Sequence, residues 1–286
     1  MCESCGCAFT DAALSAEPVR HGMVLRAGQH GHAHGNPAAH SEQLNVMRDV
    51  LANNDRLADH NRQHFAEHGV FAVNLMSSPG AGKTTLLEAT IEALRDEFRI
   101  AVVEGDLATE NDARRIRAHG VPAVQITTGN ACHLDAGMVH NALHDVALAD
   151  VDLLFIENVG NLVCPASFDL GAHCSVALLS VPEGDDKPEK YPVMFRSVDL
   201  VLLTKTDLLE HIPEFSVERA RGSLRTIACA APIIECSSRR PESIAEWCNW
   251  LRKEVSANAR WAPLRERASR VRHEVAALEK KVQSAR

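Results

Sequence analysis

Residues 76–85 read Met-Ser-Ser-Pro-Gly-Ala-Gly-Lys-Thr-Thr; they follow an apolar run and open a helical stretch. A glycine-rich turn between a strand and a helix lets backbone N–H groups surround phosphate oxygens, and the helix N-terminus adds a favourable dipole. Lys83 is placed to reach the β- and γ-phosphates of a nucleotide, and the Thr84 hydroxyl to complete a Mg²⁺ coordination sphere. Ser77 stands where the general pattern has glycine. We therefore predict a nucleotide phosphate site formed by Gly80, Ala81, Gly82, Lys83, Thr84 and Thr85.

Short apolar runs alternate with helical stretches outward from this loop. Several runs are apolar at nearly every position, which is typical of strands covered on both faces of a parallel sheet. Their alternation predicts an α/β fold, a P-loop NTPase with a mostly parallel twisted sheet flanked by helices, over residues 70–255. The runs are residues 71–76, 100–104, 123–127, 153–157, 175–180, 200–204 and 232–235.

The segments on either side of this domain have different patterns. Residues 1–40 are rich in Gly, Ala, Pro and His and have little periodicity, so we expect a flexible, disordered metal-binding arm that contains Cys and His. Residues 41–69 have the apolar spacing of an amphipathic helix. We expect a C-terminal helical extension over residues 256–286, where apolar residues recur three and four apart. That spacing fits a short coiled coil and equally a helix packed on its own domain.

The composition argues against several classes of function. A formal net charge of −8 and a pI near 6.0 argue against a protein that binds nucleic acid by neutralising phosphates. The sequence has no run of about 18 apolar residues that could span a membrane, and its N-terminus lacks the basic and apolar segments of a secretory signal. We expect a cytoplasmic protein without a nucleic-acid or membrane partner. Its nine cysteines then favour metal or redox chemistry over a disulfide framework.

Acidic residues follow two of the predicted strands. Asp106 lies just beyond one apolar run, and Glu157 ends another, with Gly160 three residues later. Because ligands of such sheets bind at the carboxyl ends of the strands, both acids are expected beside the nucleotide. Asp106 is predicted to join Thr84 on Mg²⁺, and the Gly160 N–H to contact the γ-phosphate. The predicted catalytic residues are Lys83, Thr84, Asp106 and Glu157.

The segment Thr204-Lys205-Thr206-Asp207 follows a third apolar run and resembles the Asn-Lys-x-Asp guanine motif, with Thr204 in place of Asn. A carboxylate at Asp207 can accept hydrogen bonds from guanine N1–H and the 2-amino group, which adenine lacks. Lys205 is expected to lie along the plane of the base, and Ser237, after the last strand, to contact the base through its backbone. These residues favour GTP over ATP, and ATP remains the alternative.

Three thiols lie within the first seven residues, in the order Cys2-x-x-Cys5-x-Cys7. Thiolates select soft or borderline metals such as zinc, nickel and copper(I), so we predict a metal site that one further donor completes. The alternative is a redox-active Cys-x-x-Cys pair.

A second group of metal-ligand residues lies inside the α/β domain. Cys132 and His133 follow the third apolar run, and Cys164 lies just after the Glu157–Gly160 segment. Because both loops should emerge at the nucleotide face, we expect the three side chains to converge on one metal ion.

The remaining histidines form two patterns. His30, His32 and His34 alternate with other residues in the arm, are flanked by glycines and could hold further metal ions weakly; the alternative is a polar linker that happens to contain histidine. His60, His64 and His68 recur every four residues and therefore share one helix face, which we interpret as a solvated surface.

Taken together, these motifs resemble the HypB family, GTPases of the signal-recognition and metal-chaperone (SIMIBI) class that assist nickel insertion during [NiFe]-hydrogenase maturation. The resemblance covers residues 1–7 and about 45–255, and Ser77 belongs to the phosphate loop of this family. It rests on Cys2-x-x-Cys5-Gly6-Cys7, Asn61-Arg62-x-x-Phe65, residues 74–84, Glu104-Gly105-Asp106, residues 157–165 and Lys205 with Asp207.

The resemblance implies a set of ligands and partners. It implies GTP and Mg²⁺ as cofactors, a Ni²⁺ or Zn²⁺ site of Cys132, His133 and Cys164 at a homodimer contact, and a tight nickel site at Cys2, Cys5 and Cys7. The implied partners are a HypA-like nickel-binding protein, a SlyD-like protein in some bacteria and the precursor of the hydrogenase large subunit. Two alternatives remain: an accessory GTPase for a urease or cobalamin enzyme, and a nickel or zinc storage protein in which the nucleotide is structural.

Overall fold

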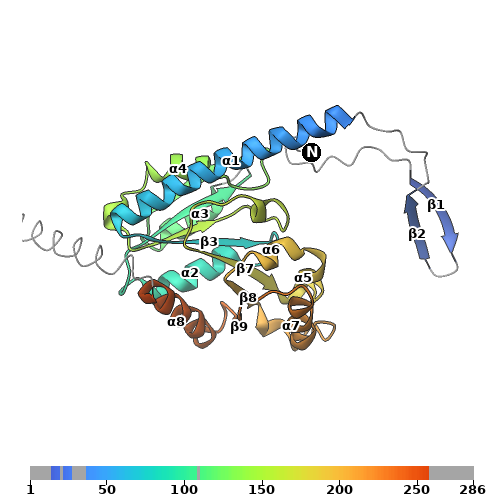
Figure 1. Ribbon diagram of the computed structural model, residues 1–286. Helices are drawn as coiled ribbons and strands as arrows, with labels where there is room; N and C mark the ends of the chain where they lie inside the picture. The colour runs from blue at the N-terminus through green and yellow to red at the C-terminus, as the bar shows by residue number, and fades with distance from the viewer. Residues whose placement is uncertain (1–13, 20–21, 28–36, 108–109, 258–286) are drawn as a thin grey trace, which may run out of the picture. The chain divides into compact units, whose positions relative to one another are not determined.

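The computed structural model describes residues 14–19, 22–27, 37–107 and 110–257 of the 286-residue chain (Figure 1). The chain divides into two compact units at the boundary between Ala52 and Asn53. The predicted thiol site at Cys2, Cys5 and Cys7, the arm histidines His30, His32 and His34 and nearly all of the predicted C-terminal extension lie outside the described residues.

The first unit contains two strands and the beginning of a helix. β1 (Leu14–Val19) pairs antiparallel with β2 (Gly22–Ala27), and α1 (Pro37–His68) begins four residues before the predicted start at residue 41. The sequence predicts a flexible arm here, and the structure adds a hairpin to that segment. Each strand has six residues, and the antiparallel register pairs Leu14 with Ala27 and Val19 with Gly22.

A parallel sheet forms the centre of the second unit. Its seven described strands lie in the order β5-β4-β6-β3-β7-β8-β9, and every neighbouring pair is parallel. The predicted α/β fold class and all of the predicted apolar strands are thereby confirmed. The strands are β3 (Phe71–Ser77), β4 (Ile100–Asp106), β5 (Ala123–Thr127), β6 (Leu153–Glu157), β7 (Cys174–Ser180), β8 (Leu200–Thr204) and β9 (Ile233–Glu235).

Helices cover both faces of this sheet. Figure 1 shows α2 and α8 on one side of β3 and α1 and α4 on the other. The helices are α2 (Lys83–Leu94), α3 (Asn111–Ala118), α4 (Ala136–Leu143), α5 (Lys187–Lys190), α6 (Pro192–Arg196), α7 (Val217–Thr226) and α8 (Pro241–Ala257), and a short 3-10 turn, η3 (Cys164–Ser167), follows β6. None of the described helices is long and apolar enough to cross a membrane.

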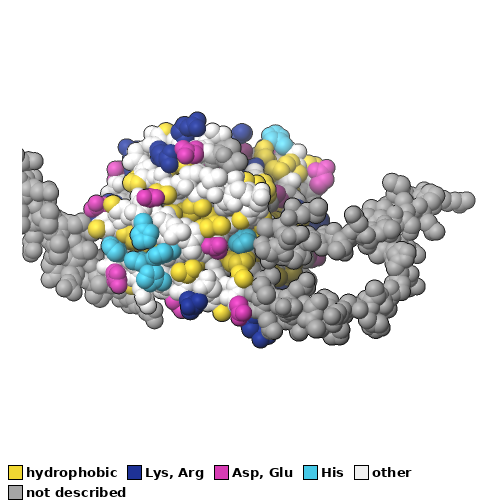
Figure 2. All heavy atoms as spheres, turned by 90° about the horizontal axis from the view of Figure 1, so that it is seen from above, with side chains coloured by type: hydrophobic (Ala, Val, Ile, Leu, Met, Phe, Trp, Pro, Cys, Tyr) yellow, Lys and Arg dark blue, Asp and Glu magenta, His cyan; other side chains and the backbone are white. Residues whose placement is uncertain are grey.

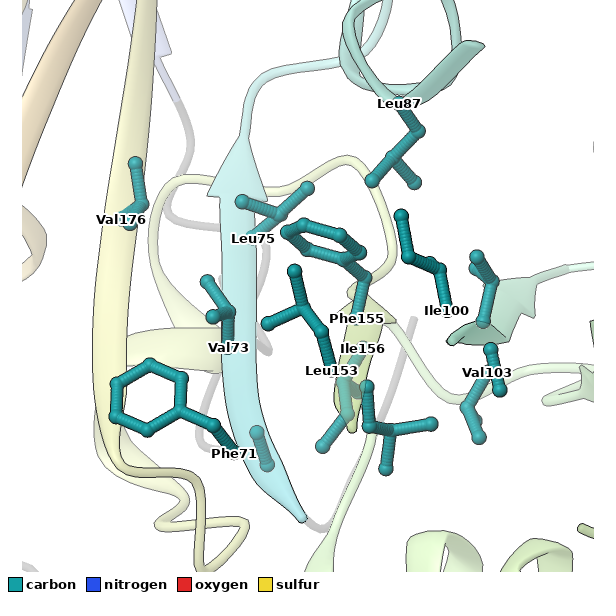
Figure 3. Close-up of a cluster of buried hydrophobic side chains, with 14 of the residues drawn as sticks. Phe71, Val73, Leu75, Leu87, Ile100, Val103, Leu153, Phe155, Ile156 and Val176 are labelled. Atoms are coloured by element: carbon teal, nitrogen blue, oxygen red, sulfur yellow. The ribbon is translucent and has the colours of Figure 1, made fainter. Parts of the chain in front are cut away.

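The core surrounds the central strand β3, whose seven residues are all buried. Figure 3 shows Val73 and Leu75 of β3 among side chains of β4, β6 and α2, including Phe155 and Leu87. Because helices cover both sheet faces, apolar residues are stabilised on both faces of β3, and this strand shows no regular alternation of apolar and polar residues.

The sheet order also places the ligand site. The chain passes from β3 over β6 to β4, and later from β6 over β3 to β7, so the direction of winding reverses at β3 and β6. Ligands of open α/β sheets bind outside the carboxyl ends of the strands at such a reversal. The phosphate loop begins at that end of β3.

Candidate nucleotide and metal site

The phosphate loop has a backbone that only its glycines adopt without strain. Gly80 has φ of 76° and Gly82 has φ of 98°, both in the left-handed region. The end of β8 holds this loop: Thr204 Oγ1 donates to Ala81 O at 2.8 Å, and Lys205 Nζ donates to Gly80 O at 2.6 Å. The structure thus gives Thr204, where the guanine motif has Asn, a contact with the loop.

Lys83 is buried at the start of α2. Its Nζ donates to Ser77 Oγ at 3.1 Å and lies 3.9 Å from Glu157 Oε1. The Ser77 hydroxyl, at the position where the general pattern has glycine, therefore holds the ammonium group in place. Thr84 Oγ1 donates to the same Glu157 oxygen at 3.0 Å, so three of the predicted residues meet within one small volume.

Glu104 is a residue of this site that had no role in the sequence analysis. It lies directly opposite Glu157 in the register of β4 and β6, and both carboxyl groups are buried. Burial and, next to it, the neighbouring Glu157 carboxyl together raise the pKa of Glu104 to about 11, opposed by Lys83. Burial also raises the pKa of Glu157, opposed by Lys83. The feature of the sequence that could have identified Glu104 is a carboxylate inside an otherwise apolar strand, two residues before Asp106.

Two adjacent cavities contain the predicted nucleotide residues. The first, of about 440 Å³, is lined among others by Gly80, Gly82, Lys83, Thr84, Thr85, Asp106, Glu157 and Gly160. Within the described part of the chain, Glu104 Oε2 and Glu157 Oε2 are buried without a hydrogen-bond partner. Buried carboxylate oxygens without partners are unfavourable unless a cation or water reaches them. The residues present therefore fit a hydrated Mg²⁺ with a nucleotide phosphate.

The second cavity, of about 270 Å³, lies at the guanine motif and includes Ala81, Lys205, Asp207 and Ser237 in its lining. Ser237 Oγ donates to Asp207 Oδ1 at 2.6 Å, so its side chain, beyond the predicted backbone contact, orients the carboxylate. That hydrogen bond, helped by Arg239 and Arg240, lowers the pKa of Asp207. Asp207 is therefore ionised at neutral pH and can accept hydrogen bonds from a base.

Gly160 lies against the phosphate loop. A Cβ at this position would come within 2.9 Å of Pro79 Cα, so the close contact requires glycine. The buried Asn158, which the sequence analysis did not single out, accepts from Leu134 N at 3.1 Å and from Val159 N at 3.0 Å. It thereby joins the segment after β6 to the loop that carries Cys132 and His133.

Cys132, His133 and Cys164 converge as predicted. The two sulfur atoms are 3.0 Å apart, Cys132 Sγ lies 3.9 Å from His133 Nδ1, and one ligand atom from each residue falls within 4.8 Å of the others. Partial burial lowers the pKa of His133, opposed by Asp135, and this favours the neutral imidazole that binds metals. The His133 ring stacks on Phe168 with centroids 3.9 Å apart. Two thiols and an imidazole suit Zn²⁺ and Ni²⁺, with a further position left for another donor.

One prediction follows from the buried carboxyl pair. With a folded pKa near 11 and an ordinary value of 4.5, Glu104 stays protonated in the folded chain while the unfolded chain ionises it. The free energy of unfolding of the nucleotide-free and metal-free protein should therefore fall as pH rises from about 5 to 9. Glu104→Gln should remove much of that fall and add about 1–3 kcal/mol at pH 7. Denaturant unfolding at several pH values measures both effects.

The exposed Glu189 of α5 offers a matched control for this measurement. Glu189→Gln should leave the pH dependence of the wild type unchanged. Equal slopes for the wild type and Glu104→Gln would contradict the prediction.

Comparisons with known proteins identify the family of this chain. Residues 71–235 match the family model described as CobW/HypB/UreG, nucleotide-binding domain. The chain is 48% identical over 268 residues to the hydrogenase maturation factor HypB of Azotobacter chroococcum, covering 93% of this chain and 86% of the relative. It is 44% identical over 227 residues to the hydrogenase/urease maturation factor HypB of Helicobacter hepaticus, covering 78% and 93%.

A solved structure shares the fold. The crystal structure of HypB from Helicobacter pylori in complex with nickel superposes with a TM-score of 0.69 at 45% identity, covering 72% of this chain and 96% of that one. The identity and the coverage far exceed what a shared fold alone gives. The chain belongs to the HypB family, and its nucleotide-binding domain is of the CobW/HypB/UreG type.

Proposed function

We propose that this chain is a GTP-hydrolysing nickel metallochaperone that assists the GTP-dependent insertion of nickel into the hydrogenase large-subunit precursor. The observation that carries the proposal is the physical link between two sites. Cys164 lies four residues after Gly160, which contacts the phosphate loop, and Asn158 bonds the loop that follows Cys132 and His133. The relatives are named hydrogenase maturation factors, and a related structure is in complex with nickel.

The residues around the phosphate cavity have different roles in the hydrolysis of GTP. The glycine-rich backbone and Lys83 bind and orient the phosphates, and Thr84 and Asp106 would hold Mg²⁺, which supplies charge neutralisation at the transferred phosphoryl group when bound. Lys83 and the Thr84 hydroxyl both contact Glu157 Oε1, so Glu157 positions these two groups. The buried Glu104–Glu157 pair keeps a proton at neutral pH, which limits negative charge beside the phosphates.

Nickel is the cargo in this proposal, and Cys132, His133 and Cys164 receive it. The same ligand set would also bind Zn²⁺. Cys2, Cys5 and Cys7, outside the described residues, are proposed as a second nickel site. The proposed assembly acts in the cytoplasm. In it the chain forms a homodimer and works with a HypA-like nickel-binding protein and, in some bacteria, a SlyD-like protein.

The proposed coupling is tested by measuring nickel affinity in two nucleotide states. Ordering of residues 157–160 by a γ-phosphate should shift Cys164 relative to Cys132, so affinity with a non-hydrolysable GTP analogue and with GDP should differ by about 5-fold or more, typical of coupled sites. The measurement is made on the full chain with Cys2, Cys5 and Cys7 changed to Ala. Equal affinities in the two states would refute the coupling.

Base preference gives an independent prediction. Asp207→Asn removes a charged acceptor for guanine N1–H and the 2-amino group. The affinity for GTP should therefore fall about 10- to 100-fold, and the affinity for xanthine nucleotides should rise. Competition binding with GTP, XTP and ATP measures the change. The exposed Asp145→Asn is the control. An unchanged nucleotide preference would contradict the guanine assignment and favour an ATPase.

A urease precursor is the second candidate target, because the Helicobacter hepaticus relative is named a hydrogenase/urease maturation factor.

A further inference from the structure

Histidines from two helices meet on the surface that carries α1. Figure 2 shows a group of His side chains together on this face. His60 Nε2 and His64 Nε2, both of α1, lie 3.2 Å apart. The ring of His140, from α4, lies 4.8 Å from that of His60 and 5.4 Å from that of His64. One ligand nitrogen from each of the three falls within 4.8 Å of the others, and the side chains range from half-buried to exposed.

The two helices are fixed against each other at this point. Asn61 Nδ2 donates to Ala136 O at 3.0 Å, and Ala136 N donates to Asn54 Oδ1 at 2.8 Å, so α1 holds the first turn of α4. Gly171 packs closely on the same helix, since a Cβ there would lie 2.4 Å from Ala58 O. The three histidines are therefore positioned by buried contacts of the fold and do not depend on surface side chains to meet.

The hydrogen bonds of Asn61 also fix the protonation of His140. Asn61 Nδ2 donates to Ala136 O and to Leu170 O at 3.1 Å, so Oδ1 is the atom that faces His140 Nδ1 at 3.2 Å. His140 must then donate through Nδ1–H, which leaves the Nε2 lone pair directed away from Asn61. A hydrogen bond from the second ring nitrogen is what orients most metal-binding histidines. Partial burial and the neighbouring histidines lower the pKa of His140, which favours this neutral form.

We propose that His60, His64 and His140 form a site for a divalent transition-metal ion, distinct from the site of Cys132, His133 and Cys164. Two histidines four apart on a helix can bind one ion from the same face. Metal–nitrogen bonds of about 2.0–2.1 Å place neighbouring ligand nitrogens roughly 3 Å apart, so His60 and His64 need little adjustment. Imidazole ligands without thiolate favour Ni²⁺, Cu²⁺ and Zn²⁺ over soft monovalent ions.

A second group of possible ligands also includes His64. The ligand atoms of His64, Glu67 and His68 lie within 4.8 Å of one another. Because the Nδ1 of His68 lies 2.9 Å from His64 O, the Nε2 of His68 is the nitrogen that could bind a metal ion. His64 therefore stands between two candidate sets on one face of α1. In both sets a hydrogen bond to Nδ1 fixes the tautomer of one histidine. The set with His140 has three imidazoles from two helices, with two of their Nε2 atoms already 3.2 Å apart, and it is the one we propose.

The test compares metal binding by full-length variants in which Cys2, Cys5, Cys7, Cys132 and Cys164 are changed to Ser. Ni²⁺ and Zn²⁺ are titrated in competition with a chelator. Adding His60→Gln, His64→Gln and His140→Gln should remove one bound ion per chain, and His140→Gln alone should weaken that ion at least about 10-fold. The control replaces His119 and His211, which lie away from this group, with Gln. The proposal is overturned if the triple variant binds as many ions as its parent with the same affinity.

Imidazole spectroscopy of the unmutated chain tests the site without relying on a variant that folds. Long-range ¹H–¹⁵N spectra should show His140 as the Nδ1–H tautomer before metal is added. Its Nε2 resonance should shift as Zn²⁺ is titrated beyond the thiolate sites. An Nε2–H tautomer, or a His140 signal that Zn²⁺ leaves unchanged, would contradict the proposal.

Discussion

Replacing Lys83 with Ala is expected to lower the rate of GTP hydrolysis by about 10²- to 10³-fold, the loss typical when one preorganised group that stabilises transition-state charge is removed. Lys83 is buried, its ammonium is held by the Ser77 hydroxyl, and it is 3.9 Å from Glu157 Oε1. No other described cation occupies that position, since Lys205 Nζ bonds to Gly80 O. Phosphate release under single-turnover conditions measures the effect.

A surface lysine provides the control for this variant. Lys190→Ala removes an exposed lysine of α5 that pairs with Asp186, the residue before this helix, and its turnover should match the wild type. Thermal unfolding of Lys83→Ala shows whether the fold is retained. Undiminished hydrolysis by Lys83→Ala, or none by the wild type, would favour a storage protein in which the nucleotide is structural.

Changing Cys132 and Cys164 together to Ser is expected to weaken nickel binding at this site by more than about 100-fold. Changes in the outer shell of metal sites typically cost 10- to 100-fold, and this variant removes two direct ligands. The two sulfur atoms are 3.0 Å apart, so both should contact the same ion. Equilibrium competition with a chelator measures the loss, in the full chain with Cys2, Cys5 and Cys7 changed to Ala.

The same double variant should also abolish any difference in nickel affinity between GTP-analogue and GDP states. Cys229, a half-buried free cysteine outside the cluster, supplies the control. Cys229→Ser should keep both the affinity and its nucleotide dependence. Retained tight binding in the double variant would mean that the nickel ligands of this domain lie elsewhere.

Local pattern was sufficient to predict the phosphate loop and the order of the secondary structure. A strand, a glycine-rich turn and a helix are adjacent in sequence, so Gly80, Gly82, Lys83 and Thr84 could be assigned before any tertiary contact was known. The apolar runs predicted the strands because strands that are buried on both faces of a sheet consist mostly of apolar residues. Cys132, His133 and Cys164 could be grouped because both loops follow strands at the same edge of the sheet.

Contacts between distant segments could not be predicted in this way. Glu104 faces Glu157 because β4 and β6 are neighbours in one particular register, although β5 lies between them in the sequence. Thr204 contacts Ala81 because β8 ends beside the phosphate loop. Ser237 contacts Asp207 because β8 and β9 are parallel neighbours, so the loops that follow them lie side by side. Such pairings depend on the sheet as a whole.

The fold class, the phosphate loop and the grouping of Cys132, His133 and Cys164 could be predicted from the amino-acid sequence, because each depends on short motifs and on the rule that parallel strands end at one edge. The connection between the two sites and the meeting of the histidines became visible in the folded structure. The spacing of His60, His64 and His68 indicated a solvated helix face, and it could not include His140, which reaches that face because Asn54 and Asn61 dock α1 on α4. Packing between helices whose bonded residues are 75 and 82 positions apart has no signature in local periodicity, since it is set by buried hydrogen bonds that form only in the folded chain.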